Sequence, residues 1–276
     1  MTLQSEAEGR LRRVSSRQNA LVKDLRKAFT QTEPTAEGYI AVEGVRIIEE
    51  GIRSGLRFQA VFFSEAGRAH AARLLPQIAS QVEILLLPAD VFSSAVNTES
   101  PQGVAALVKL RPAKFEDLVE QVAPELLLIG VAGVQDPGNL GTIIRSAEAF
   151  GARAILLGEK TASHFNPKAV RASAGSLFRE PLIRVKLGES IATLKQQGVR
   201  VLATSSHKGK PLHEADFTGS AMIVVGNEGA GVPGEILALA DELVTIPHSP
   251  RVESLNAGIA ASILLYEAAR QRGKIG

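Results

Sequence analysis

Short apolar runs alternate with amphipathic or alanine-rich segments along the chain, a pattern typical of a layered α/β protein. In the first 110 residues the runs predict strands at 39–42, 58–63, 82–87 and 103–109, with helices at 18–29, 44–54 and 67–79. Beyond residue 125 they predict strands at 125–134, 154–157, 182–185, 201–204, 221–225 and 242–246, with helices at 140–150, 167–177, 189–197 and 257–269. The second set of strands and crossovers indicates a doubly wound parallel sheet. Asn139 is expected to cap the helix at 140–150.

Residues 111–124 divide the two sets of elements. They contain Pro112 and Pro124, mixed charge and only a short amphipathic stretch, so few side chains there are suited to either core. We therefore expect an amino-terminal arm and small α/β domain at 1–110, a linker at 111–124, and a larger parallel-sheet domain at 125–276.

Composition excludes several classes of protein. The 276 residues are 45% hydrophobic and 22% charged, as in an ordinary globular protein. The chain has no cysteine, which excludes disulfides, thiolate metal sites and cysteine nucleophiles. The five histidines show no metal-ligand spacing, so no metal site is expected. No signal peptide and no apolar run of about 18 residues is present, so we expect a cytoplasmic protein.

Positive charge is concentrated at the amino terminus, although the net charge of the chain is only +2. Residues 1–30 contain seven Lys or Arg and only three acidic residues. Such an arm can neutralise RNA phosphates, and the alternative is a solvated tail and helix face.

Three polar clusters follow predicted strands of the larger domain: Asn139 with Arg145, Asn227 with Glu228, and Ser254 with Asn256. The carboxyl ends of parallel strands share one edge of a sheet, where ligands bind. Taken singly, each cluster has a simpler explanation, such as helix capping, an exposed arginine or an ordinary turn. The fingerprints G-x-G-x-x-G, Walker A and G-x-S-x-G are absent.

The three clusters lie in segments that together resemble the sequence motifs of the SpoU (TrmH-like) RNA 2′-O-ribose methyltransferases of the SPOUT superfamily. The segments are 136–151 (DPGNLGTIIRSAEAFG), 223–233 (IVVGNEGAGVP) and 246–267 (IPHSPRVESLNAGIAASILLYE), in the family's order. The stretches SRQNALVKDL and YIAVEGVRIIEEGI also resemble the family's small RNA-binding domain. This resemblance implies a deep trefoil knot, a homodimer with the helix at 257–269 as a candidate interface, and an RNA substrate, with rRNA favoured over tRNA.

The resemblance also implies roles for individual residues. The implied catalytic residues are Asn139, Arg145, Glu228, Ser254 and Asn256. The residues implied to hold S-adenosylmethionine are Thr204, Gly226, Ile246, Leu255 and Asn256. For RNA binding we expect Arg12, Arg13, Arg17, Lys23 and Arg46. The third segment departs from the family pattern, because residues 247–253 (PHSPRVE) lack the usual glycine, which affects the conformation of the loop.

The expected reaction needs neither a metal nor a covalent intermediate. It needs the ribose 2′-oxygen in line with the methyl group, and it needs the proton removed. An always-charged guanidinium is a poor base, so Arg145 is expected to clamp a phosphate, while the phosphate or Glu228 assists proton loss. Two alternatives remain open: an RNA-binding protein that has lost catalysis, and a Rossmann-type nucleotide-binding enzyme.

Overall fold

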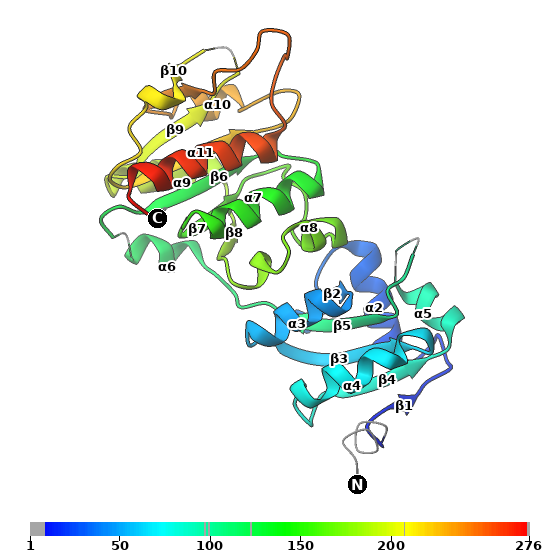
Figure 1. Cartoon of the computed structure of the whole chain (residues 1–276). Coiled ribbons are helices and arrows are strands. Elements are labelled where there is room, and N and C mark those ends of the chain that lie inside the picture. The colour runs from blue at the N-terminus through cyan, green and yellow to red at the C-terminus, as the bar shows by residue number, and fades with distance from the viewer. Residues whose placement is uncertain (1–8, 97, 99, 122, 207, 275–276) are drawn as a thin grey trace. The chain divides into compact units, whose positions relative to one another are not determined.

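The computed structural model describes residues 9–96, 98, 100–121, 123–206 and 208–274 (Figure 1). The chain divides into two compact units. Unit 1 comprises Met1–Arg111 and Phe165–Phe178, and unit 2 comprises Pro112–His164 and Arg179–Gly276. The segment 165–178, which was expected in the larger domain, is therefore grouped with the amino-terminal unit.

In its described residues, unit 1 is built on a mixed five-stranded sheet with the strand order β1-β4-β3-β5-β2. The strands are β1 (Arg12–Arg13), β2 (Ile40–Glu43), β3 (Arg57–Ser64), β4 (Glu83–Leu87) and β5 (Val104–Lys109). β4 pairs in parallel with β1 and β3, whereas β5 pairs antiparallel with β2 and β3. The predicted strands occur within about two residues of their expected positions, and the short β1 was not predicted.

Helices α2 (Ala20–Gln31) and α5 (Ala89–Ala95) cover one face of this sheet, where Phe29 and Phe92 join the buried cluster around Phe62. Helix α3 (Val45–Arg53) contacts β2 and β5. The helix expected at 67–79 is instead a 3₁₀ turn (Ala66–His70), α4 (Ala71–Leu74) and a second 3₁₀ turn (Leu75–Gln77). Pro76 explains the break, because it has no N–H to continue an α-helix. Helix α8 (Pro167–Ala172) and a 3₁₀ turn (Ser176–Phe178) complete the unit.

Unit 2 contains a parallel sheet, which confirms the α/β class expected from the sequence. In the described residues it has seven strands in the order β10-β12-β9-β11-β6-β7-β8. They are β6 (Leu127–Ala132), β7 (Ala154–Leu157), β8 (Leu182–Arg184), β9 (Arg200–Thr204), β10 (Lys210–Pro211), β11 (Ala221–Gly226) and β12 (Glu242–Thr245). β6 and β11 are fully buried, as their continuous apolar sequences predict. The two-residue β10 was not predicted.

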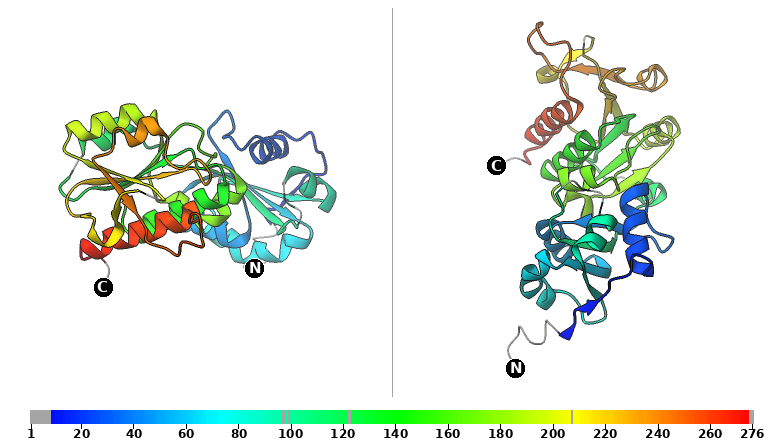
Figure 2. Two further views of the ribbon diagram at one scale, coloured as in Figure 1. Left: turned by 90° about the horizontal axis from the view of Figure 1, so that it is seen from above. Right: turned by 90° about the vertical axis from the view of Figure 1, so that its right-hand side faces the viewer.

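Helices cover both faces of this sheet (Figures 1 and 2). α7 (Pro137–Ala149) and α11 (Ala257–Gln271) pack side by side on one face. On the other face, α6 (Phe115–Glu120), α9 (Leu187–Gln196) and α10 (Gly234–Leu237) contribute to one buried apolar cluster. A 3₁₀ turn (Leu212–Glu214) lies between β10 and β11. α6 belongs to the segment expected as a linker, and its Leu118 packs into that cluster.

The carboxyl ends of β6, β11 and β12 bring the three sequence segments to one edge of the sheet, where the loop after β9 also lies. In the described part of the chain, no helix is both long and apolar enough to cross a membrane.

Candidate active site

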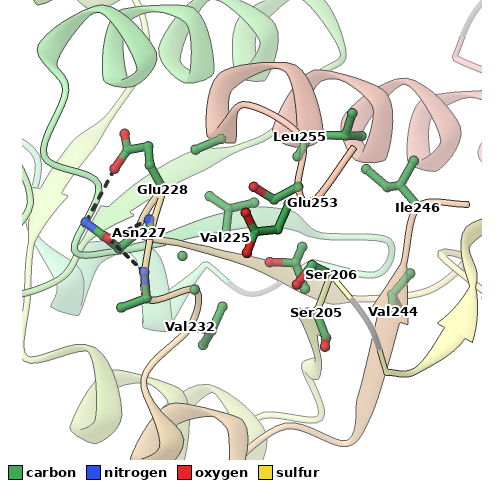
Figure 3. Close-up of a pocket in the computed structure, with 18 of the residues that line it drawn as sticks. Ser205, Ser206, Val225, Asn227, Glu228, Val232, Val244, Ile246, Glu253 and Leu255 are labelled. Atoms are coloured by element: carbon green, nitrogen blue, oxygen red, sulfur yellow. Dashed lines mark hydrogen bonds between the residues drawn. The ribbon is translucent and has the colours of Figure 1, made fainter. Parts of the chain in front are cut away.

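A pocket of about 400 Å³ lies at the carboxyl ends of β9, β11 and β12 (Figure 3). Its walls come from the loop after β9, the loop after β11 and the segment between β12 and α11. The lining residues are Thr204, Ser205, Ser206, Val225–Val232, Leu237, Val244, Ile246, His248, Glu253, Ser254, Leu255, Ala257 and Ala260. Apolar and hydroxyl-bearing side chains are therefore combined in one concave site, as in pockets for small molecules.

The loop after β11 is tightly closed on itself. A Cβ atom at Gly226 would lie 2.1 Å from the carbonyl carbon of Gly231 and 2.2 Å from the amide nitrogen of Val232. Asn227 holds the turn, because its Oδ1 accepts hydrogen bonds from the amides of Gly229 and Ala230, at 2.9 and 3.1 Å. Only glycine at 226 permits this close approach of backbone to backbone.

Helix α7 begins earlier than the sequence indicated. Its N-cap is Asp136, whose Oδ1 accepts a hydrogen bond of 2.8 Å from the amide of Asn139. The expectation that Asn139 caps this helix is therefore wrong. Pro137 explains the shift, because its fixed φ and missing N–H suit the first position of a helix. The side chain of Asn139 is thus left available for other partners.

Those partners come from the other two segments. Asn139 Nδ2 donates to Glu228 Oε1 at 2.9 Å, and Asn139 Oδ1 accepts from Asn256 Nδ2 at 2.8 Å. Asn256 in turn caps α11, since its Oδ1 accepts from the amide of Ile259 at 3.2 Å. One hydrogen-bonded chain, Glu228–Asn139–Asn256, therefore joins all three segments.

Glu228 is held in its ionised form. Burial raises the pKa of its carboxyl group, but hydrogen bonds from Asn139 and from backbone amides outweigh this effect, so the pKa lies below its ordinary value. Its second oxygen, Oε2, faces the amide of Gln135 at 3.4 Å and the side-chain amide of Asn227 at 3.4 Å. Both carboxylate oxygens thus have donors, and a carboxylate with a lowered pKa is a weak base.

Most of the predicted site residues lie in the pocket or beside it. Thr204, Gly226, Ile246 and Leu255, expected to hold the cofactor, line the pocket, and so do Glu228 and Ser254. Asn139 and Asn256 do not line the pocket, but they are hydrogen-bonded to each other beside Glu228.

Arg145 is set apart from this group. It is exposed on α7, six residues after Asn139, so its side chain leaves the helix about 120° away from that of Asn139. It has no hydrogen bond or ion pair with any other described residue.

Asn227 was expected in a polar cluster with Glu228, but no structural role was predicted for it. It organises the loop, and its Asn-x-Gly sequence is a turn signal that could have indicated this role. Glu253 lines the pocket (Figure 3), and no pattern in the sequence singled it out. With Glu228 it gives the pocket two carboxylates, while no Lys or Arg is found among the described residues of its lining. The pocket therefore favours a positively charged ligand over a polyphosphate.

The five residues expected to bind RNA lie in unit 1 and are exposed. Arg12, Arg13 and Arg17 form ion pairs with Glu83, Glu65 and Asp90, at 3.1, 3.3 and 2.8 Å. The side chains of Lys23 and Arg46 have no ion pair with another described residue. Exposed ion pairs contribute little to stability, so RNA phosphates can compete for these arginines.

Comparison with known proteins agrees with this geometry. Residues 126–266 match the model of the SpoU rRNA Methylase family, and residues 19–106 match that of the MRM3-like substrate binding domain. The chain belongs to the SpoU rRNA methylase family. The first match confirms the family resemblance found in the sequence. The second match confirms a substrate-binding domain in the amino-terminal part of the chain.

The chain is also similar to characterised and solved family members over nearly its whole length. It is 35% identical to the 23S rRNA (guanosine(2553)-2′-O)-methyltransferase RlmP of Bacillus subtilis, over 93% of this chain and 98% of the relative. The S-adenosylmethionine-bound rRNA methyltransferase from Sinorhizobium meliloti matches with a TM-score of 0.81 and 29% identity, over 95% and 98% of the two chains. The SpoU methyltransferase AviRb from Streptomyces viridochromogenes, in complex with the same cofactor, matches with a TM-score of 0.79 and 29% identity, over 92% and 98%.

Proposed function

We propose that this protein transfers a methyl group from S-adenosylmethionine to a ribose 2′-hydroxyl of ribosomal RNA. The observation that carries the proposal is the hydrogen-bonded chain of side chains Glu228–Asn139–Asn256, which joins the three family segments at the edge of an acidic pocket. A binding module that has lost catalysis has no need of such a chain. A Rossmann-type nucleotide enzyme is disfavoured because the pocket presents carboxylates where polyphosphate binding requires donors and cations.

The pocket suits S-adenosylmethionine in shape and charge. Gly226 keeps the floor free of a side chain, Ile246 and Leu255 offer apolar contact, and Thr204 offers a hydroxyl. The cofactor supplies an activated methyl group on a positively charged sulfur. Glu228 and Glu253 provide negative charge in the same pocket, which favours such a cation.

Asn139 is the residue we assign to orienting the reacting end of the RNA. Its amide is fixed at both ends, by Glu228 and by Asn256, so its direction is set before substrate binds. Preorganised dipoles of this kind lower barriers because they need no reorganisation during reaction. We assign Glu228 to holding Asn139 in place. We assign the assistance of proton loss to the substrate phosphate and not to Glu228. Ser254, at the pocket wall, is assigned to contacting substrate.

Arg145 is assigned to clamping an RNA phosphate in the active site of a partner subunit. Its side chain diverges from Asn139 on the same helix, which favours action on another chain over action on its own site. A homodimer through α7 and α11 would provide that arrangement. α11 exposes Ile259 (52%) and Tyr266 (47%), which are seven residues apart and therefore lie on one helix face.

We assign RNA binding in unit 1 to Arg12, Arg13, Arg17, Lys23 and Arg46, as expected from the sequence. We also assign the protein to the cytoplasm, as expected from the sequence. The trefoil knot implied by the family resemblance likewise stays a prediction for this chain.

The test is transfer of labelled methyl groups from S-adenosylmethionine to separate rRNA and tRNA pools, each then digested to nucleosides. The expected result is a labelled 2′-O-methyl nucleoside from rRNA alone. Label on a base, or label confined to tRNA, would contradict the proposal. Cofactor titration complements the assay, because binding of S-adenosylmethionine without any transfer would favour the non-catalytic alternative.

A further inference from the structure

Unit 1 contains a cavity of about 640 Å³ that the proposed methyl transfer does not use. It lies where β3 begins, between the turn before β2, the end of α3 and the segment before β4. Among its lining residues are Glu37, Tyr39, Arg57, Phe58, Gln59 and Gln77. An aromatic ring, amides, a carboxylate and a guanidinium are thus gathered in one hollow.

Gln59 is the most informative of these residues. The pairing of β3 with β5 shifts register between Phe58 and Ala60, so Gln59 occupies a β-bulge. Bulges re-aim side chains and recur beside functional sites. Gln59 Nε2 donates to Glu37 Oε2 at 3.1 Å, whereas Gln59 Oε1 is buried and has no hydrogen-bond partner among the described residues. A buried acceptor without a partner is costly unless a ligand donates to it.

Positive charge is placed at the same end of the strands. Arg57 and Lys109 are directly opposite each other in the β3–β5 pairing. Like charges in this relation repel, and an anion between them would relieve the repulsion. Lys109 Nζ donates to the carbonyl of Glu37 at 2.8 Å and lies 5.6 Å from the centre of the Tyr39 ring. Arg57 lines the cavity and has no ion pair with a described residue.

We propose that this cavity holds one unpaired nucleotide of the RNA substrate. Phe58 provides a surface for the base, the oxygens of Gln59 and Glu37 accept hydrogen bonds from its edge, and Arg57 and Lys109 bind its phosphate. Adjacent acceptors favour guanine, whose Watson–Crick edge carries N–H donors at N1 and N2. The inference rests on the proposed function in taking RNA as the substrate.

The direct test uses the full-length protein and two labelled pentanucleotides, UUGUU and UUAUU, measured by fluorescence anisotropy. We expect the guanine-containing strand to bind about fivefold to tenfold more tightly, as one well-recognised base allows. Gln59→Leu should abolish this preference, while Gln31→Leu, at the exposed end of α2, should keep it. Arg57→Gln should weaken both strands about equally and reduce the salt dependence, unlike Arg53→Gln, because Arg53 does not line the cavity.

A second readout separates this inference from the proposed function. With methyl transfer to rRNA as the assay, Gln59→Leu and Arg57→Gln should raise KM for RNA and leave kcat and cofactor affinity near wild type. Equal binding of both strands by wild type and variants, with KM unchanged, would overturn the inference. That result would favour a protein segment as the occupant of the cavity, and it would leave the proposed methyltransferase activity intact. Absence of methyl transfer by wild type would contradict the proposed function alone, because oligonucleotide binding is measured without it. Arg57 is exposed, so its variant tests the site even if Gln59→Leu fails to fold.

Discussion

The side chains of Asn139 and Asn256, 117 positions apart in the sequence, are joined by a hydrogen bond of 2.8 Å. Asn139 uses its oxygen for this bond and its nitrogen for Glu228, so the amide cannot rotate without losing both partners. The start of α7 is thereby connected to the start of α11 and to the loop after β11. Residues that have separate simple explanations in the sequence form one unit in the structure.

Asn139→Asp tests whether this unit is needed for catalysis. The substitution places a second carboxylate against Glu228, which removes the donor and adds repulsion. We expect the rate of methyl transfer to fall by about 100-fold or more, the scale seen when a preorganised dipole is lost. Affinity for S-adenosylmethionine, measured by calorimetry, should change little, because Asn139 does not line the pocket. Asn166→Asp is the matched control, since Asn166 caps α8 in the other unit. A rate near wild type would contradict the assignment.

Glu228→Gln distinguishes a positioning role from that of a general base. The lowered pKa and the donors on both oxygens favour positioning, so an uncharged acceptor should preserve part of the function. We expect a loss of about tenfold, below the range typical of removing an acid–base group. The pH dependence of kcat should keep its shape. Disappearance of an acidic limb from that profile in the variant would instead identify Glu228 as the base.

Much of the fold could be predicted because its elements have strong local patterns. The run at 125–134 is apolar on both faces, and the structure places β6 between β11 and β7 in the sheet. Less regular elements were missed. α5 is seven residues long and contains two serines, and β1 has only two exposed arginines, so neither shows a hydrophobic period.

The site could be predicted only in part. Sequence motifs identified Asn139, Glu228 and Asn256, but the helix cap was assigned to Asn139 because asparagine is a common N-cap. The structure gives the cap to Asp136, which frees Asn139 for the hydrogen-bonded chain. The signal for this exchange was local, because Pro137 suits the first position of a helix. Local propensity contains no information about the two partners that Asn139 then finds on loops from other parts of the chain. The same holds for Glu253, whose role depends on how its loop folds over the pocket.

Gly226→Ala should disrupt the cofactor pocket. The added methyl group would meet backbone atoms of Gly231 and Val232 at about 2 Å, and backbone cannot move aside as a flexible side chain can. We expect loss of S-adenosylmethionine binding and a lower melting temperature. Gly229→Ala, in the same loop, is the control, because its Cβ would meet only Asn227 Oδ1, at 3.7 Å. Equal cofactor affinities of the two variants would refute this account of the loop.

Glu180→Gln should change how stability depends on pH. Burial, followed by the nearby carboxylate of Glu148, raises the pKa of Glu180 from 4.5 to about 7, against the smaller opposing effects of Arg179 and Arg153. The folded state therefore binds this proton more tightly than the unfolded state does. The contribution is fully present below pH 4.5 and is lost as the pH rises through about 7.

The measurement is the free energy of unfolding in urea at pH 5 and pH 8, for wild type and Glu180→Gln. The variant should gain stability relative to wild type at pH 8 and show little difference at pH 5. Burial also lowers the pKa of His164 to about 4, but this effect is common to both proteins and cancels in the comparison. A difference between the two proteins that is the same at both pH values would contradict the prediction.

Arg145 provides the test of assembly, because its side chain points away from the Asn139 of its own helix. If Arg145 serves the partner's site, a heterodimer of one Arg145→Ala chain and one Asn139→Ala chain contains one site with both residues and one with neither. Such heterodimers, purified through two different affinity tags, should show about half of the wild-type rate, because a symmetric dimer has two equivalent sites. Each homodimeric variant should be nearly inactive.

The reciprocal heterodimer pairs a wild-type chain with a chain carrying both substitutions. It should be nearly inactive, since each of its sites then lacks one residue. The opposite pattern, with the reciprocal heterodimer active and the first inactive, would place Arg145 in the site of its own chain.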